Sequence, residues 1–135
     1  MSVFTENERK FLGGQLPGGG GGPLLARIAT VGQDGTPHVV PVGFRFDPNI
    51  DVIEVGGFDN ERTKKYRDVQ RTGRAAIVID DLASTDPWRP RGVEVRGRAE
   101  ALDGDQPVIR IHPERIVPWG LDAGETARSV KSERA

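Results

Sequence analysis

The chain has 135 residues, of which 29% are charged, with a formal net charge of −1 and no cysteine. This length fits one domain, which can bury about two-thirds of its extended-chain surface. The near-neutral charge argues against a general nucleic-acid binder, and the absence of cysteine excludes disulfides and thiolate metal sites. No apolar run approaches the roughly 20 residues of a membrane span, and the first ten residues are too polar for a signal peptide. We therefore expect a cytoplasmic protein with no membrane or nucleic-acid partner.

The N-terminal segment, residues 1–23, is predicted to be a short helix followed by a linker. Thr5 and Glu8 have the spacing of a capping box, and a pair of glycines ends the apolar stripe that follows. Residues 18–22 are five consecutive glycines between two prolines. Because no Lys-Ser/Thr pair and no helical pattern follow them, they do not form a P-loop, and a flexible linker is expected.

A β-hairpin is the clearest pattern in the chain. Val, Ile, Thr and Phe dominate residues 24–31 and 38–46, and Asp34-Gly35 between them supplies positive-φ residues for a tight turn. A turn signal at residues 47–49 leads into a strand over 50–55, so a three-stranded meander is predicted. Neither hairpin strand carries a nucleophile or a carboxylate pair. We expect this hairpin to support a bound ligand rather than to supply reacting groups.

The remaining pattern completes a barrel. In chain order it predicts a helix over residues 60–70 that Thr63 or Asn60 caps, a strand over 74–80, a polar loop over 81–90, a strand over 92–102, and two short strands over 108–112 and 115–117 separated by Pro113. Residues 122–135 are polar and are expected to fray. The fold class is mainly β: one barrel domain over residues 24–121, with six or seven mostly antiparallel strands and one or two short helices.

A phosphate site is one interpretation of Arg62, Thr63, Lys64 and Lys65 at the start of the interior helix. Unpaired amides, the helix dipole, a hydroxyl and cationic side chains converge there. The alternative is a solvated helix end with surface lysines. Cations at a helix N-terminus are mildly unfavourable, so their presence at this end favours a ligand.

Trp88 and Trp119 are candidates for stacking on a planar ligand, with packing at a barrel edge or subunit contact as the alternative. Arg89 and Arg91, beside Trp88, could pair with an anionic ligand. The two histidines, His38 and His112, lack a carboxylate pattern nearby and are expected to be strand residues with satisfied nitrogens rather than metal ligands. No metal site and no catalytic side chain is predicted.

Four segments, in this order, resemble the flavin/deazaflavin oxidoreductase superfamily, the pyridoxamine 5′-phosphate oxidase-like split β-barrels. They are LARIATVGQDGTPHVVPVGFRFD, RTKKYRDVQRTGRAAIVIDD, RGVEVRGRAEAL and IRIHPERIVPWGLD. Together they cover nearly three-quarters of the chain, and the likeness is greatest to small actinobacterial members identified as probable F420-dependent enzymes. The glycine run at residues 18–22 departs from the pattern of these proteins.

The resemblance implies a homodimer with two equivalent cofactor sites at the subunit interface. The cofactor ring would rest on the strand after the hairpin turn, and the phosphate would bind at the start of the interior helix. The residues to which the resemblance assigns cofactor contacts are Val39, Val40, Pro41 and Val42 for the ring, Thr63 and Lys65 with Arg62 and Lys64 for the phosphate, and Trp88 and Trp119 for the site lining.

The activity that the resemblance implies is hydride transfer between a reduced ring and an unsaturated or carbonyl-containing small molecule. Coenzyme F420 is favoured as the cofactor because its oligoglutamate tail needs extra cations, which Arg89 and Arg91 could supply. One alternative is an FMN-binding oxidoreductase of the pyridoxamine phosphate oxidase type. A second alternative is a flavin or deazaflavin carrier that is not an enzyme.

Overall fold

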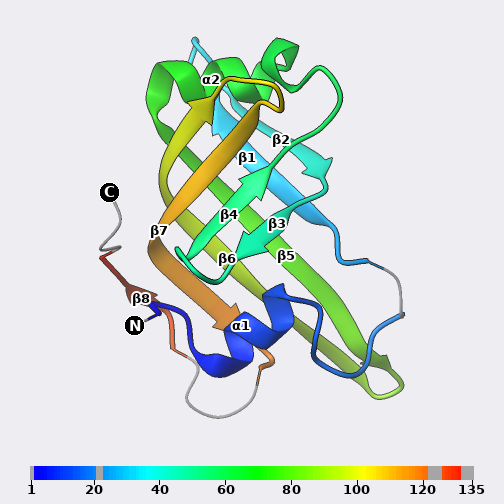
Figure 1. Cartoon of the computed structure of the whole chain (residues 1–135). Helices are drawn as coiled ribbons and strands as arrows, with labels where there is room; N and C mark the ends of the chain where they lie inside the picture. Colours follow the sequence, from blue (N-terminus) through cyan, green and yellow to red (C-terminus); the bar gives the residue numbers. More distant parts are fainter. Residues whose placement is uncertain (1, 21–22, 122–125, 132–135) are drawn as a thin grey trace.

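The computed structural model describes residues 2–20, 23–121 and 126–131, which form one antiparallel sheet with two α-helices (Figure 1). The strands are β1 (Ala26–Val31), β2 (Pro37–Val42), β3 (Arg45–Asp47), β4 (Val52–Val55), β5 (Arg74–Thr85), β6 (Trp88–Leu102), β7 (Val108–Trp119) and β8 (Arg128–Ser129). The helices are α1 (Glu6–Leu12), the 3₁₀ turn η1 (Asn60–Arg62) and α2 (Lys64–Thr72). The predicted split β-barrel class is confirmed, with eight strands rather than six or seven.

The two edges of the sheet are formed by consecutive strands. The strand order is β2-β1-β5-β6-β7-β4-β3, with β8 added to β7. Only Gly43 and Phe44 separate β2 from β3. Three Cα–Cα steps span at most about 11 Å, so the sheet must curl until its two edges approach each other. The result is a barrel that is split between β2 and β3.

The β1–β2 hairpin is confirmed, but the three-stranded meander over residues 24–55 is wrong. β2 pairs with β1 alone, whereas β3 pairs with β4 and β4 with β7. The predicted strand over residues 38–46 is therefore two strands at opposite edges. The sequence offered little warning, because a single glycine with one further residue is enough to let the chain cross the gap.

The polar loop predicted over residues 81–90 is also wrong, because β5 and β6 form a long hairpin that runs through it. β5 continues to Thr85 and β6 begins at Trp88, with a register shift between Leu82 and Ser84. The hairpin extends past the sheet toward α1 (Figure 1). Residues 85–90 at its outer end are all exposed and include two prolines and one tryptophan, so this part lacks the apolar alternation that predicts a strand.

Pro113 does not divide the last strand. β7 is continuous from Val108 to Trp119, and the register shifts so that Arg96 pairs with Arg115 and Gly97 with Pro113. This leaves Glu114 as an extra residue, which is a β-bulge. Proline has no N–H to donate, and a bulge is one of the few places where a sheet tolerates it.

Apolar side chains fill the barrel from one face of each central strand. Ile77, Ile79, Val93, Val95 and Ile116 are all buried, and they alternate with more exposed residues. The N-terminal helix closes one end, where Phe11 and Leu12 join the same core. At the other end, α2 contributes its buried Tyr66 and Val69, so helix packing explains the single tyrosine.

Both helices begin where their side chains predict. Thr5 and Glu8 form the capping box of α1. Thr63, rather than Asn60, caps α2 by accepting a hydrogen bond from the Tyr66 amide. Asn60 instead donates to the carbonyls of Val55 and Pro107 and so fixes the 3₁₀ turn that leads into α2.

The C-terminal segment is partly ordered, contrary to the frayed tail expected from residue 122 onward. β8 pairs with β7, and Arg128 forms an ion pair with Glu8 of α1, whose carboxylate is fully buried. Residues 122–125 and 132–135 lie outside the described part of the chain. Within that part, none of the helices is long and apolar enough to cross a membrane.

Gly97 provides a test of the β6–β7 bulge. A Cβ at this position would lie 1.9 Å from the carbonyl oxygen of His112, within backbone that cannot yield cheaply. Gly97→Ala should lower the free energy of unfolding by about 3 kcal/mol through overpacking. Urea unfolding followed by circular dichroism measures the change. Gly20→Ala is the control, since nothing lies within 4 Å of its added Cβ, and equal stability of the two variants would contradict the described bulge.

Candidate functional site

The start of α2 presents cations without acidic partners. The first turn of this helix contains no acidic residue. Among the described residues, neither Lys64 nor Lys65 has an ion pair with a carboxylate. The backbone N–H groups of these two lysines belong to the first turn, where the helix itself provides no carbonyl partner. The turn therefore offers amide donors and positive charge to an anion.

Lys65 is half-buried, and this burial lowers the pKa of its ammonium group. A desolvated cation without a counter-ion is unfavourable on its own, and a bound anion would relieve that cost. Thr63, in contrast, is occupied by the fold: its hydroxyl donates to the Asn60 carbonyl at 2.6 Å and accepts from the Tyr66 amide. The exposed Arg62 lies just before this cap.

The predicted ring strand, β2, is an open edge with exposed apolar residues. Val39 is 71% exposed and Val40 is 38% exposed, and the next residue, Pro41, is also exposed. Only Val42 packs against the core. An edge strand with apolar residues on both faces and no Asp, Glu, Lys or Arg is a surface that a flat ligand or a second chain could cover.

A hollow, which we call the split hollow, begins where β2 ends. Gly43 and Phe44 line one side of it, and Gly56, Gly57 and Val108 line the other. Its volume is about 740 Å³. A second hollow of about 460 Å³ shares Gly56, Gly57 and Val108 with the first. Its lining also includes Phe58 and three acidic residues, Asp59, Glu61 and Asp105. The two hollows are neighbours, and Lys64 and Lys65 line neither of them.

A buried acid lies on the wall of the split hollow. The carboxylate of Glu54 receives hydrogen bonds from Arg45 and Arg110. Burial alone would raise its pKa, but these two guanidinium groups outweigh burial and hold the pKa below the usual value. Glu54 therefore stays ionised at neutral pH, which makes it a poor proton donor.

A second buried carboxylate, Asp68, connects α2 to the β1–β2 hairpin. Its Oδ2 atom accepts from the Thr30 hydroxyl at 2.8 Å and lies 2.9 Å from Nδ1 of His38, while Arg71 approaches Oδ1 at 3.4 Å. Burial raises the pKa of Asp68, and the three hydrogen-bonding partners lower it further than burial raises it. The net pKa lies below the usual value, so the carboxylate is ionised and His38 donates to it from Nδ1.

Trp88 and Arg89 lie far from α2 within one chain. Both are exposed at the outer end of the β5–β6 hairpin. The twelve residues of β5 separate this end from the C-terminus of α2, which corresponds to about 40 Å at 3.3 Å per residue. Figure 1 shows α2 and the hairpin end at opposite ends of the barrel. One chain does not bring these two groups of predicted site residues together.

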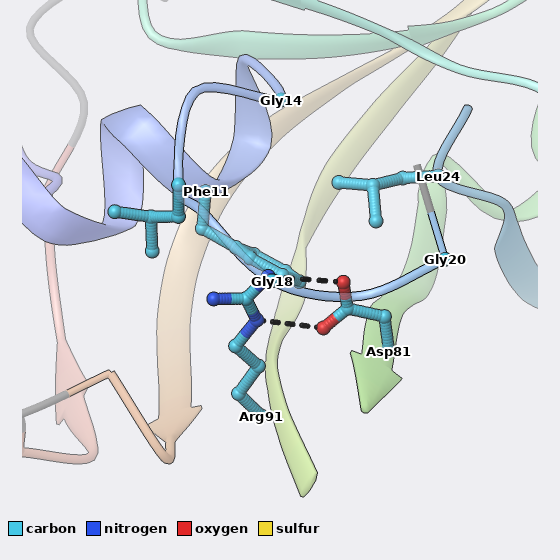
Figure 2. A pocket seen from close by; sticks show the side chains of 8 residues that line it. Phe11, Gly14, Gly18, Gly20, Leu24, Asp81 and Arg91 are labelled. Carbon is cyan, nitrogen blue, oxygen red and sulfur yellow. Dashed lines mark hydrogen bonds and ion pairs between the residues drawn. The ribbon is translucent and has the colours of Figure 1, made fainter. Parts of the chain in front are cut away.

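Arg91 is held within the protein. Its guanidinium forms a two-pronged ion pair with Asp81, at 2.7 and 3.2 Å, and donates to the Pro17 carbonyl at 2.8 Å. It also lies over the Phe11 ring, 5.4 Å from the centroid. Figure 2 shows this pair beside Gly18 in a small cavity of about 160 Å³. The expected anion contact of Arg91 is thus made to Asp81.

The predicted linker packs closely on the same hairpin, where it is described. Gly18 and Gly19 have positive φ angles, and the Gly19 amide donates to the Ala83 carbonyl. An added Cβ on Gly18 would lie 2.8 Å from that carbonyl oxygen. Glycine is required here for close approach to β5, and this part of the run serves as a strap rather than a loose tether.

Trp119 is half-buried against β6. Gly92 leaves room for its ring, since a Cβ there would lie 2.5 Å from Cζ2 of Trp119. The next residue, Gly120, has a positive φ and lies against Pro90. Packing at a barrel edge, the alternative considered for Trp119, therefore describes its place in this chain.

Sequence reasoning missed Asp68, Phe44 and Phe58. Phe58 is 93% exposed beside the second hollow. Asp68 could have been found from its position, because it adjoins Val69 on the apolar face of the helix, where a charge needs a partner. Both histidines do have carboxylate partners, since His112 Nε2 lies 2.6 Å from Glu100. Within the described residues, no group of three or more potential ligands could hold a metal ion.

Comparisons with known proteins identify the family to which this chain belongs. The family model of pyridoxamine 5′-phosphate oxidase matches residues 21–129. The chain belongs to the pyridoxamine 5′-phosphate oxidase family. A curated relative, the 5a,11a-dehydrotetracycline/5a,11a-dehydrooxytetracycline reductase of Streptomyces rimosus, is 38% identical over 96% of this chain and 95% of its own length. As a member of this family with a reductase for a full-length relative, the protein is an oxidoreductase of the flavin/deazaflavin type.

Solved structures share the fold at lower identity. A conserved hypothetical protein of Mycobacterium tuberculosis is 18% identical, with a TM-score of 0.64 over 98% of this chain and 96% of that one. An F420 reductase is 23% identical, with a TM-score of 0.55 over 70% and 89% of the two chains. An FAD-binding protein of Mesorhizobium loti is 18% identical, with a TM-score of 0.55 over 69% and 83%. At these identities, the likeness of this chain to the three structures shows a common fold.

The low pKa of Asp68 has a measurable consequence for stability. Because its folded pKa lies below that of the unfolded chain, its contribution is present above about pH 4 and is lost as the pH falls through the folded value. Asp68→Asn should lower the free energy of unfolding by about 1–3 kcal/mol at pH 7, and the gap to the wild type should shrink toward pH 3.

Urea unfolding of both proteins at pH 7, 5 and 3 measures that gap. Asp105→Asn, at an exposed position in the turn before β7, is the control and should leave it near zero at each pH. A gap for Asp68→Asn that stays constant over this range would show that the carboxylate's charge is not the stabilising feature.

Proposed function

We propose that this protein is a reductase that uses coenzyme F420 to deliver a hydride to an activated carbon–carbon double bond or a carbonyl group of a small molecule. The observation that carries the proposal is the first turn of α2, which contains two lysines and no acidic residue, on a barrel whose open edge strand, β2, exposes small apolar side chains. Support comes from the Streptomyces relative, whose name describes reduction of a dehydro compound.

The residues present fit a planar cofactor with a phosphate. The unpaired, half-buried Lys65, with Lys64 and the free amides of the first turn of α2, would hold the phosphate. The exposed backbone and small apolar side chains of Val39, Val40 and Pro41 would support the ring. When bound, the reduced deazaflavin supplies the hydride.

The chain's own residues would bind, orient and exclude water. The split hollow is lined mostly by glycine and apolar residues, and its carboxylate, Glu54, is kept ionised by two arginines. Since Glu54 does not donate a proton readily, the proton that accompanies the hydride would come from solvent. Catalysis would then depend on placing the substrate against the ring rather than on an acid of this chain.

A homodimer would complete this site. The apolar residues Leu25, Val31, Val39 and Val40 are exposed on and around the open β1–β2 edge, between 38% and 71% of each side chain's surface. Covering them with a second copy would remove this surface from water. A second copy could also supply Trp88 and Arg89, which one chain places at the opposite end of the barrel from α2.

FMN is the second candidate cofactor. The preference for F420 relied on two arginines to bind its acidic tail, and Arg91 is already paired with Asp81. Arg89 remains exposed and is available to such a tail. FMN, whose phosphate ends the molecule, would need only the cations at the start of α2. A carrier without turnover is the third candidate.

Titration of the purified protein with F420 and with FMN, followed by ring fluorescence, separates these candidates. Preferential F420 binding, with oxidation of the reduced cofactor by enones or quinones, is the expected result. Tight FMN binding without F420 affinity would overturn the F420 assignment. Binding without oxidation by any member of a broad panel of enones, quinones and tetrapyrroles would favour the carrier. Sedimentation at the titration concentration tests the dimer.

Lys65→Ala tests the phosphate end of the site. Removing a half-buried cation that contacts a phosphate should weaken cofactor binding by about 1.5–3 kcal/mol, which is roughly 10- to 150-fold. The unfolding midpoint should change little, since Lys65 has no ion pair among the described residues. Lys10→Ala on α1 is the control. Unchanged affinity at matched salt would remove Lys65 from the site.

A further inference from the structure

His38 is the first residue of β2 whose side chain reaches another element. Its Nδ1 lies 2.9 Å from Oδ2 of Asp68, a carboxylate that is 3% exposed in the middle of α2. Among the described strands, β2 pairs with β1 alone and has no ladder on its other edge. The His38–Asp68 contact is therefore a direct side-chain attachment of this open edge to the helix.

The imidazole of His38 lies in a slot that a glycine provides. A Cβ on Gly32 would lie 2.4 Å from Cε1 of His38 and 3.1 Å from its Nε2. The backbone of Gly32 is outside the left-handed region, so conformational freedom does not explain the glycine. The space beside Gly32 is filled by the histidine ring, and this is a second observation, independent of the hydrogen bond, that the ring position is built into the fold.

Asp68 is equally well fixed from the other side. The Thr30 hydroxyl of β1 donates to the same oxygen at 2.8 Å, and Arg71, one turn later in α2, reaches both Asp68 and the Val31 carbonyl at the end of β1. The carboxylate is thus held by the helix and by both hairpin strands. Movement of α2 relative to β2 would break at least one of these contacts.

The two ends of this contact lie beside the two halves of the proposed cofactor site. His38 immediately precedes Val39, where the proposed ring surface begins. Asp68 lies one helical turn after Lys64, at 1.5 Å of rise per residue. We propose that the His38–Asp68 pair, seated on Gly32, is a positioning joint that holds the ring strand and the phosphate-binding helix in the register that one cofactor molecule spans.

This inference rests on the proposed function, and it makes a specific claim about how affinity arises. When a ring site and a phosphate site are held at a fixed separation, binding of one end raises the effective concentration of the other. Loosening the joint would leave each end able to bind by itself. Only a ligand that carries both ends would lose affinity. A merely structural role for His38 would not produce that difference.

Three variants and one pair of ligands test the joint. His38→Ala removes the imidazole, and His38→Asn keeps a donor near the position of Nδ1. Gly32→Ala retains every polar group but displaces the ring. The ligand pair is whichever of F420 or FMN the wild type binds, together with the corresponding ribityl compound without phosphate: the ribityl deazaflavin for F420, or riboflavin for FMN.

Fluorescence titration should show a loss of affinity for the intact cofactor on the order of tenfold in His38→Ala and in Gly32→Ala. Affinity for the phosphate-free ribityl compound should stay unchanged in both variants. His38→Asn should recover much of the loss. The double variant Gly32→Ala/His38→Ala should be no worse than His38→Ala alone, because without the imidazole the added methyl displaces nothing. Gly20→Ala is the matched control for an added methyl group.

Equal losses of affinity for the intact cofactor and for the ribityl compound would contradict the proposed positioning role, since His38 would then only shape the ring surface. Unchanged affinity for the intact cofactor in both single variants would overturn it as well. Should His38→Ala fail to fold, Gly32→Ala, which displaces the imidazole, and His38→Asn, which keeps a donor toward Asp68, still give the comparison. A wild type that binds neither F420 nor FMN would defeat the proposed function itself, which is a different result from variants that keep wild-type affinity.

Discussion

The length of the connection between β2 and β3 constrains this whole structure. Gly43 and Phe44 must carry the chain from one edge of the sheet to the other, and a connection that short forces the two edges together without allowing them to pair. The split hollow and the exposed face of β2 both follow from this constraint. The proposed site lies at the split between β2 and β3, where the barrel is not closed by hydrogen bonds.

Buried carboxylates join segments that are distant in the sequence. Glu8 forms an ion pair with Arg128, and Glu54 forms ion pairs with Arg45 and Arg110. Asp68 accepts hydrogen bonds from Thr30, His38 and Arg71. Breaking a buried ion pair by removing one partner is costly, whereas the intact pair adds little net stability. These contacts therefore specify which segments meet more than they increase stability. In this protein they join the N-terminal helix to β8, β4 to its neighbours β3 and β7, and α2 to the β1–β2 hairpin.

The sequence predicts the interior of the fold better than its edges. The capping box at Thr5, the hairpin turn through Gly35 and the alternation around Val93 and Val95 each depend on local chemistry, and each is found in the structure. Of the two turn residues Asp34 and Gly35, only Gly35 takes the predicted positive φ. The outer β5–β6 hairpin and the bulge at Glu114 depend on pairing with a distant strand, which local propensity does not encode. Pro113 was misleading for that reason.

The same distinction applies to the candidate site. Lysines at a helix start are visible in the sequence because the dipole makes them unfavourable there. The partner of Arg91 was not visible, because ten residues and an unrecognised hairpin separate it from Asp81. Asp68 and His38 are 30 positions apart and meet only through tertiary packing. Contacts between side chains distant in sequence form only when the chain folds, so local sequence patterns do not predict this part of the site.

The glycine strap also determines which segments must be kept for the outer β5–β6 hairpin to hold its structure. Its backbone covers the ion pair between Arg91 and Asp81, and the Pro17 carbonyl takes one of the guanidinium donors. Shortening the chain to the barrel alone would expose this pair to water and leave the outer hairpin without its cover. The smallest unit that keeps the hairpin's shape therefore includes the N-terminal helix and the strap, although neither belongs to the barrel.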